Sequence, residues 1–433
     1  MNARTTRRAL AAGALTATLI LSASSALAAP SSARAAEARP PAPGKVAVDV
    51  AAEAGIAALD TRTWGAAPYD YDGDGAEDVL IGYHSPKKLW RNEGAGAYAV
   101  VPQGDWPSNG VDRHDCAWGD VDGNGRPDLY CAAGRGSKNK VKNELQDNEL
   151  WLQGADGTFT EVGTAWGVGD LCGRGRAVAF LHANGDAWLD LFVGNMAPRK
   201  RVANDPCDGS PRSRSEGSKV FLNEGGTGFR FAPRFSSFAP ATGSQCVEVL
   251  DFNRDGRDDL FTCRNLRAQP SLYVNKRGAA LREVTGRHRL AAQINDADVT
   301  DLDADGDPDL VTAFEGGFAY QLNKRGVFSA RTVISRVRNG TGKAVAVGDA
   351  DGDGDLDVYG MVGGGSARNP DDRILLNSRL RFTGVRVPSA TGAADEVVAV
   401  RRDAASPQVE FLALNGYNLQ GKGPIQLIRL VPR

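Results

Sequence analysis

Short apolar segments alternate with acidic loops along most of the chain. The loops read DYDGDGAED, DVDGNGRPD, HANGDAWLD, DFNRDGRDD, DLDADGDPD and DADGDGDLD, at residues 70–78, 120–128, 182–190, 251–259, 301–309 and 349–357. Each loop is followed by an apolar run such as VLIGY or LFTCR, and most loops also follow one. Apolar runs on both sides of a polar turn predict a β-hairpin centred on each loop.

The hairpins belong to a longer repeat. The loops recur about every fifty residues, with a longer interval around the third copy, and a period in this range indicates a propeller or a solenoid. Beyond each hairpin comes a third apolar run that ends in a turn, such as LWLQGADGTF, and usually a fourth, such as TEVGTAWGV. Four antiparallel strands in each unit predict one blade of a β-propeller.

A seventh unit is predicted at 397–433. It keeps the strand–loop–strand form, but Arg402, Ala404 and Ser406 stand where the other loops have acidic residues. It ends on IQLIRL without a fourth strand, whereas the segment VAVDVAAEAGI at 46–56 precedes the first unit. We therefore expect an all-β fold over residues 45–433: a seven-bladed β-propeller whose last blade is closed by the N-terminal strand, which leaves no open sheet edge.

Five of the loops share one spacing of oxygen-bearing side chains. Asp or Asn occupies positions 1, 3 and 5, Gly position 6, and Asp position 9. Hard oxygen ligands in this number favour Ca²⁺ over zinc, copper or octahedral Mg²⁺, and a divalent cation would offset the repulsion among the carboxylates. The predicted ligands of about five calcium ions are Asp70, Asp72, Asp74, Asp78, Asp120, Asp122, Asn124, Asp128, Asp251, Asn253, Asp255, Asp259, Asp301, Asp303, Asp305, Asp309, Asp349, Asp351, Asp353 and Asp357.

Two other interpretations of the loops fit the sequence less well. An EF-hand requires Glu at position 12 and flanking helices, but here that position holds Ile, Cys, Thr or Gly and the flanks are strands. Plain acidic turns would account for one loop, not for five with the same spacing. The third loop departs from the pattern with His182 at position 1 and Ala187 at position 6, so we expect weak metal binding there or none.

These loops, within blades of about fifty residues, resemble the FG-GAP/VCBS repeats of integrin α-chain-type β-propellers. The segment NELWLQGADGTFTEVGTAWGV is similar to segments of the cartilage acidic protein family and its bacterial relatives. The resemblance covers roughly residues 45–433 and implies the fold and the calcium loops. It further implies that the calcium loops share one face and that partners bind the opposite face.

The N-terminal residues predict export. Residues 1–28 begin with arginines, continue through an apolar run and end on Ala26-Leu27-Ala28, which is typical of a signal peptide of the general or the twin-arginine route; an uncleaved membrane anchor is the alternative. Residues 29–44 are rich in Ala, Pro and Ser and are expected to form a flexible lead-in. A net charge of −2 argues against binding to nucleic acid, and we expect a secreted monomer without stable membrane insertion.

The six cysteines are expected to pair within blades. Cys116 and Cys131 are nearly symmetric about the centre of their loop, as are Cys246 and Cys263, so each pair should face across its hairpin. This leaves Cys172 with Cys207. Buried free thiols are the alternative.

A binding site is expected on the face opposite the calcium loops. Two long insertions, 134–149 and 195–218, lie there, and loops on a rigid scaffold commonly carry recognition. The turns that lead into the innermost strands add charged and aromatic residues that could bind an anionic or carbohydrate ligand, although polar strand ends bonded to the backbone would give the same pattern. These ligand candidates are Arg62, Trp64, Arg113, His114, Arg174 and Arg176.

Two classes of function remain open. The sequence contains no G-x-S-x-G or H-E-x-x-H motif, which favours a non-enzymatic binding or adhesion module for an extracellular protein or a cell-wall or matrix polysaccharide. The alternative is a carbohydrate-active protein, either a lectin or a polysaccharide lyase. A lyase would need a Lys, His or Tyr base beside a calcium-bound uronate, whereas a lectin would not.

Overall fold

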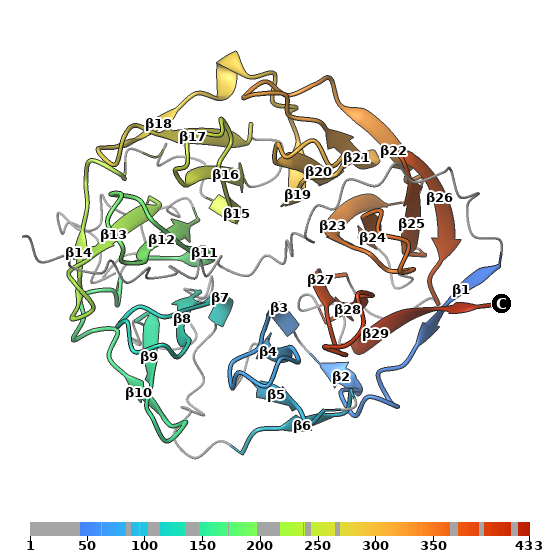
Figure 1. Ribbon diagram of the computed structural model, residues 1–433, viewed down its shortest axis with the longest axis horizontal. Coiled ribbons are helices and arrows are strands. Elements are labelled where there is room, and N and C mark those ends of the chain that lie inside the picture. Colours follow the sequence, from blue (N-terminus) through green and yellow to red (C-terminus); the bar gives the residue numbers. More distant parts are fainter. Residues whose placement is uncertain are drawn as a thin grey trace, which may run out of the picture.

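The computed structural model describes residues 44–433 apart from 62, 84–87, 95, 103–112, 135–146, 172, 197–216, 237, 239–243, 265–268, 339, 364–370, 389–393 and 417–422. In this part of the chain, seven antiparallel sheets stand around a central axis (Figure 1). The predicted all-β, seven-bladed propeller is therefore confirmed. The predicted export signal and lead-in lie outside the described residues.

Six blades are built from consecutive strands, ordered from the axis outwards. Blade 1 consists of β3 (Thr63–Tyr69), β4 (Asp78–Tyr83), β5 (Lys88–Asn92) and β6 (Tyr98–Val100), blade 2 of β7 (Arg113–Gly119), β8 (Asp128–Ala133), β9 (Glu149–Gln153) and β10 (Phe159–Glu161), and blade 3 of β11 (Gly175–Leu181), β12 (Asp190–Asn195), β13 (Lys219–Asn223) and β14 (Phe229–Phe231). Blade 4 consists of β15 (Ser244–Leu250), β16 (Asp259–Arg264), β17 (Ser271–Asn275) and β18 (Leu281–Glu283), blade 5 of β19 (Ile294–Thr300), β20 (Asp309–Phe314), β21 (Gly317–Gln321) and β22 (Thr332–Arg336), and blade 6 of β23 (Thr341–Gly348), β24 (Asp357–Gly363), β25 (Arg373–Ser378) and β26 (Arg381–Arg386).

The seventh blade joins the two ends of the described chain. Its strands are β27 (Glu396–Val400), β28 (Glu410–Leu414), β29 (Gly423–Pro432) and β1 (Lys45–Asp49), and β2 (Ala58–Thr61) also pairs with β29. The register of β1 on β29 runs from Lys45 opposite Pro432 to Asp49 opposite Ile428. The innermost strand β27 also contacts β3, so the predicted closure by the N-terminal strand is confirmed.

The apolar core lies between neighbouring blades rather than at the centre. One cluster combines Tyr130 and Leu150 of blade 2 with Phe180 and Leu191 of blade 3, and equivalent clusters fill the other interfaces. Because side chains alternate along a strand, each blade presents apolar side chains to both neighbours. The described helical element is the short 3₁₀ turn η2 (Thr285–Arg287), and nothing helical in the described ranges has the length and apolar character needed to cross a bilayer.

Two of the predicted disulfides are present. Cys116 lies directly opposite Cys131 in the register of β7 on β8, and the two are bonded. Cys246 and Cys263 are bonded in the same way across β15 and β16. The third expected pair, Cys172 with Cys207, lies outside the described residues.

Candidate functional site

The six acidic loops connect the innermost strand of a blade to its second strand, so all of them emerge on one face of the ring. We call them loops 1 to 6 after their blades and number their residues 1 to 9. In five loops the position-1 aspartate accepts a hydrogen bond from the backbone N–H of the position-6 glycine, at 2.7–3.0 Å. Those glycines have φ between 75° and 91°, a left-handed conformation that favours glycine. The recurring Asp and Gly thus shape the centre of these five loops together.

The carboxylates of these loops converge. Ligand atoms from three aspartates lie within 4.8 Å of one another in loops 1, 2, 5 and 6. Loop 4 has the amide residue Asn253 at position 3 and otherwise keeps Asp at positions 1, 5 and 9. The sets of three are Asp70, Asp72 and Asp78; Asp120, Asp122 and Asp128; Asp301, Asp303 and Asp309; and Asp349, Asp351 and Asp353. These groups could each hold a metal ion.

The surroundings of two carboxylate oxygens show whether a cation fits these loops. The Oδ1 atoms of Asp303 and Asp351, both at position 3, are buried and receive no hydrogen bond from the described part of the chain. A buried carboxylate oxygen without a donor costs free energy. Each lies within a ring of further carboxylate oxygens, and a hard cation is the partner that such an oxygen-only set accepts. The residues present therefore fit a metal ion.

Position 9, predicted from the sequence as a metal ligand, also has a structural role. In all six loops the aspartate there accepts one hydrogen bond from the backbone N–H of position 2 and one from the end of the third strand, at 2.6–3.1 Å. In loop 5, for example, Leu302 and Asn323 donate to Asp309. Because loop 3 keeps this aspartate as Asp190, the arrangement does not depend on the calcium spacing.

Burial dominates the ionisation of these position-9 aspartates. It raises the pKa of Asp259 and Asp309 to about 7 and that of Asp357 to about 8, although the backbone N–H donors lower it. Neighbouring loop carboxylates raise the pKa further, since their negative charges repel. The loops therefore hold uncompensated negative charge, which a bound cation would offset.

Sequence reasoning missed the residue that joins loops to the next blade. The third strand of most blades ends in Asn or Gln, and its side-chain amide donates to the position-2 carbonyl of the preceding blade. Asn323 donates to the carbonyl of Phe252 at 2.8 Å, and Asn223 to that of Val121 at 2.8 Å. The recurring N in LWRN, VFLN, LYVN and QLN was the available signal. These amides tie neighbouring blades together beneath the acidic loops.

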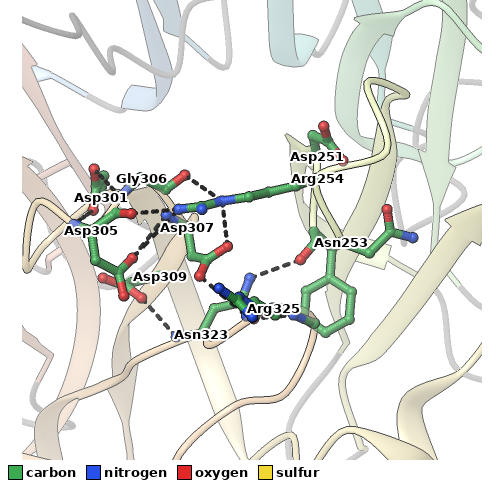
Figure 2. Close-up of polar contacts among 12 residues, drawn as sticks. Asp251, Asn253, Arg254, Asp301, Asp305, Gly306, Asp307, Asp309, Asn323 and Arg325 are labelled. Carbon is green, nitrogen blue, oxygen red and sulfur yellow. Dashed lines mark hydrogen bonds and ion pairs between the residues drawn. The ribbon is translucent and has the colours of Figure 1, made fainter.

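One basic side chain spans two acidic loops. Arg254, at position 4 of loop 4, extends across to loop 5 (Figure 2). Its Nε donates to the carbonyl of Gly306 at 3.1 Å and lies 2.6 Å from Oδ1 of Asp307, while Nη2 donates to the carbonyl of Asp305 at 2.5 Å. Arg254 has a φ of 56°, unusual for a residue with a side chain. Its guanidinium thus connects two candidate metal loops.

The loop of blade 7 differs from its sequence-based alignment. The register places Val400 opposite Glu410, which makes this loop one residue longer than the others. The backbone N–H of Arg401 donates to Glu77 of loop 1, as that of His182 at position 1 of loop 3 donates to Asp258 of loop 4. Arg401 therefore takes position 1, and Arg402, which the sequence alignment put there, takes position 2.

The innermost strands surround a central cavity of about 630 Å³. Most of its charged lining is acidic, whereas the candidates from the sequence are expected to bind an anionic or carbohydrate ligand. Some of these carboxylates join blades: Asp115 accepts from the N–H of Val178 at 2.8 Å, and Asp298 from that of Val347 at 2.9 Å. The acidic lining residues are Asp115, Glu248, Asp251, Asp296, Asp298, Asp301, Asp395 and Glu396, and the basic ones are His114, Arg176, Arg254 and Lys343.

The predicted ligand candidates have different surroundings in the structure. Arg113 is buried, and its guanidinium makes a two-fold ion pair with Glu149 on β9 of the same blade. Arg174 is also buried and donates to the sulfur of Met196 at 3.8 Å. His114 and Arg176 do line the cavity. The alternative from the sequence ties such residues to the backbone, whereas the guanidinium of Arg113 is bonded to the carboxylate of Glu149.

The other candidates are not placed by the structure. Arg62 lies outside the described residues, and only the backbone of Trp64 is described, in β3. Most of the two long insertions, at 135–146 and 197–216, also lies outside them. Their predicted part in recognition stays a prediction.

The fold and the loops together define a seven-bladed propeller with a repeated candidate metal loop. The model of the FG-GAP-like repeat matches residues 70–131 and 301–360, which include loops 1, 2, 5 and 6. The chain thus carries FG-GAP-like repeats, and the resemblance seen in the sequence is confirmed.

Two curated relatives carry the same name. Cartilage acidic protein 1 from Homo sapiens and that from Mus musculus are each 27% identical over 175 residues, or 40% of this chain. The match spans 23% of the human protein and 24% of the mouse protein, so this chain covers a minor part of their length.

Two solved structures are similar at lower identity. A lectin of Agrocybe aegerita that recognises non-reducing terminal N-acetylglucosamine is 16% identical, with a TM-score of 0.46 over 77% of this chain and 80% of the lectin. The exotype rhamnogalacturonan lyase YesX is 15% identical, with a TM-score of 0.43 over 82% of this chain and 64% of the lyase. Likeness at this level says nothing about a shared ligand.

Proposed function

We propose that this protein is a secreted, calcium-stabilised β-propeller that serves as a non-enzymatic binding module for an extracellular partner. The five loops with Asp at position 1 would each hold one Ca²⁺ through the side chains at positions 1, 3, 5 and 9. The calcium assignment rests on the buried, unbonded Oδ1 atoms of Asp303 and Asp351 within their carboxylate rings. Bound calcium would supply charge compensation to the loops, which is a structural role.

Two features support secretion. The chain contains disulfides between Cys116 and Cys131 and between Cys246 and Cys263, and such bonds persist in oxidising compartments. Residues 1–28 have the composition of an export signal. A mature protein that starts after Ala28 when isolated from culture medium is the expected result.

The central cavity supports a binding role. It is large enough for a small ligand or for a side chain of a partner, and it combines apolar with charged lining. Because acidic residues outnumber basic ones there, a partner that presents neutral or positively charged groups fits better than a polyanion. From the sequence an anionic or a carbohydrate ligand is expected, and the acidic lining favours the carbohydrate of these two.

Thermal unfolding in calcium and in excess chelator tests the scaffold. A ligand that binds only the folded state stabilises it by about 2.7 kcal/mol per site at a free concentration of 100 Kd. With several such sites, we expect the Tm to fall by more than 10 °C, as an order of magnitude, when calcium is removed. Magnesium at equal concentration should restore only a small part of the loss. An unchanged Tm in chelator would contradict the calcium scaffold.

Binding assays test the role of the cavity. Amine-bearing chitosan oligosaccharides, neutral cello-oligosaccharides and polygalacturonate present three different charges to the same cavity. We expect preference for the first, and loss of that preference in the double variant Asp298→Asn/Glu396→Gln. The matched control Lys276→Ala/Arg282→Ala changes two exposed residues of blade 4 and should bind as the unaltered protein does.

The same assays separate a binding module from an enzyme. Release of unsaturated product from polygalacturonate, followed by ultraviolet absorbance, should be undetectable. Measurable turnover would favour the lyase alternative, and preferred binding of polygalacturonate would contradict the ligand charge proposed for the cavity.

A further inference from the structure

Loop 3 differs from loops 1, 2, 4, 5 and 6 at two positions that depend on each other. In those five loops the position-1 carboxylate accepts the N–H of the position-6 glycine. Loop 3 has His182 at position 1 and Ala187 at position 6. Ala187 is not among the residues with positive φ, so its backbone does not adopt the left-handed conformation of those glycines. The loop has lost both the acceptor and the turn that brings the donor to it.

His182 makes a different contact inside loop 3. Its Nδ1 lies 3.2 Å from the backbone carbonyl of Trp188 at position 7. A carbonyl oxygen is an acceptor, so Nδ1 donates in this bond. A carbonyl near position 7 is one that a calcium loop is expected to turn toward its ion. The histidine N–H thus donates to an oxygen that would otherwise be available to a cation.

Loop 3 nevertheless keeps the shape of its ends. Asp190 accepts from the N–H of Ala183 at 2.9 Å and from that of Asn223 at 2.9 Å, as its equivalents do in the other five loops. The amide of Asn275 donates to the carbonyl of Ala183 and joins loop 3 to blade 4. The different residues at positions 1 and 6 therefore alter the centre of loop 3, whereas the hydrogen bonds at its ends are kept.

The loop of blade 7 also contains an internal hydrogen-bond donor, but there the donor is an arginine. Arg402, which is 7% exposed, lies with Nε 2.8 Å from Oε2 of Glu410 and donates from Nη2 to Oε1 at 2.9 Å. Its third nitrogen, Nη1, donates to the carbonyl of Gly96 in blade 1. Glu410 occupies the place of the position-9 aspartate. Arg429 also donates from Nε to Oε1 of Glu410 at 2.5 Å, so two permanent cations of the protein offset that carboxylate at the junction that closes the ring.

We propose that blades 3 and 7 are closed by internal donors, His182 and Arg402, in place of metal ions, and that these two blades keep their loops folded when calcium is lost. The inference rests on the proposed calcium scaffold, which it deepens by assigning which loops lie outside it. It also makes positions 1 and 6 the determinants of metal binding in each loop.

The direct test restores a calcium loop in blade 3. The double variant His182→Asp/Ala187→Gly supplies the carboxylate at position 1 and the glycine at position 6, beside Asn184, Asp186 and Asp190 that are already present. Calcium bound per chain, measured by native mass spectrometry and by titration calorimetry, should rise by one ion relative to the unaltered protein. The single variant Ala187→Gly is the matched control, because it frees the backbone without adding an acceptor, and it should bind no additional ion.

The outcomes distinguish a failure of this inference from a failure of the proposed calcium scaffold. An unaltered protein that binds about five ions while the folded double variant binds the same number would contradict the inference alone. An unaltered protein that binds no calcium would contradict the scaffold and the inference together. Thermal unfolding of each variant establishes that it is folded before its ions are counted.

Hydrogen exchange provides a second readout that needs no substitution. On chelation, amides of residues 71–77, 121–127, 252–258, 302–308 and 350–356 should exchange at least tenfold faster, whereas those of 183–189 and 402–409 should change less than twofold. Faster exchange in all seven loops to the same degree would overturn the proposal. In Arg402→Met the exchange of 402–409 should rise equally with and without calcium, because the cation lost is part of the protein.

Discussion

The acidic-loop face and the central cavity are both rich in carboxylates, but they are built in different ways. On the loop face one arrangement recurs: the position-9 aspartate accepts the same two backbone N–H groups in loops 1 to 6. In the cavity the repetition is only partial. Asp115 and Asp296, each five residues before its acidic loop, accept the N–H of Val178 and of Val345 in the next blade, at 2.8 and 3.0 Å. The blades with Gly65, Ala177 or Ala344 at that place have no carboxylate there.

This difference distinguishes the residues that stabilise the ring from the residues that could select a ligand. A feature present in every blade serves a need that every blade shares, namely the folding of its loop and its attachment to the next blade. A charged residue present in one blade breaks the pseudo-symmetry of the ring and gives the cavity an individual pattern of charge. The cavity, rather than the acidic loops, is therefore the place where ligand selectivity is expected.

The largest effect should come from the repeated anchor. Asp309→Ala leaves the buried N–H groups of Leu302 and Asn323 without their acceptor, and each such loss costs about 1–3 kcal/mol. We expect a decrease of roughly 2–5 kcal/mol in the free energy of unfolding, measured by denaturant titration in calcium. Asp190→Ala should cost as much, although loop 3 is proposed to hold no metal.

Position 3 supplies the contrast for that experiment. Asp303→Ala removes a proposed ligand but no backbone acceptor of the same kind, so it should lower the calcium content by one ion and have little effect in chelator. A large loss of stability in chelator would show that Asp303, like Asp309, anchors the loop without a metal ion. If Asp190→Ala were harmless, the anchor would depend on the metal after all.

An intermediate effect is expected from the cavity. Burial raises the pKa of Asp115 from 3.8 to about 7, Asp296 raises it further, and the N–H donors of Val178 and Cys116 lower it. Because the folded pKa lies above the unfolded one, folding favours the protonated form, and this contribution to stability is lost as the pH rises through about 7. Asp115→Asn should therefore stabilise the protein relative to the unaltered chain by roughly 1–3 kcal/mol at pH 8 and much less at pH 5.

The measurement is a series of unfolding curves between pH 5 and pH 9 at fixed free calcium. The charged groups that line the same cavity as Asp115 include His114, Arg176, Asp296 and Glu396, so Glu396→Gln is a useful second variant. A stability difference between Asp115→Asn and the unaltered protein that does not change with pH would contradict the assignment.

The smallest effect should come from the link between loops 4 and 5. The side chain of Arg254 is 44% exposed, and partly exposed ion pairs contribute little. Arg254→Ala should lower the free energy of unfolding by less than about 1 kcal/mol, but it should alter calcium affinity in loops 4 and 5 only. Arg257→Ala, which removes a guanidinium within loop 4 itself, is the matched control. Equal changes in both variants would rule out a specific link.

Because the chain repeats, most of the fold could be predicted from the sequence. The DxDxDGxxD spacing and the apolar runs around it predicted the blades, the closure by β1 and the two disulfides within hairpins, because these depend on local periodicity. The pairing of Arg113 with Glu149 was not accessible in this way. It joins the first and third strands of blade 2, and no spacing within either segment specifies which side of the strand each residue faces.

The loop of blade 7 shows a second limit. The sequence predicts Arg402 at position 1, but the additional residue in this loop moves it to position 2. Only the backbone contacts of Arg401 and the register of β27 on β28 reveal the shift. The acidic character of the cavity was missed for a related reason, since its residues come from seven separate strands whose side chains face the same space only after the ring closes.

Counting the bound calcium ions tests the central claim most directly. Protein purified from calcium-containing buffer and exchanged into volatile buffer should show about five calcium ions per chain by native mass spectrometry and by elemental analysis, one for each loop with Asp at position 1. Asp351→Asn combined with Asp353→Asn should reduce the count by one. A chain that retains its fold and carries no calcium under these conditions would contradict the account of the acidic loops as metal sites.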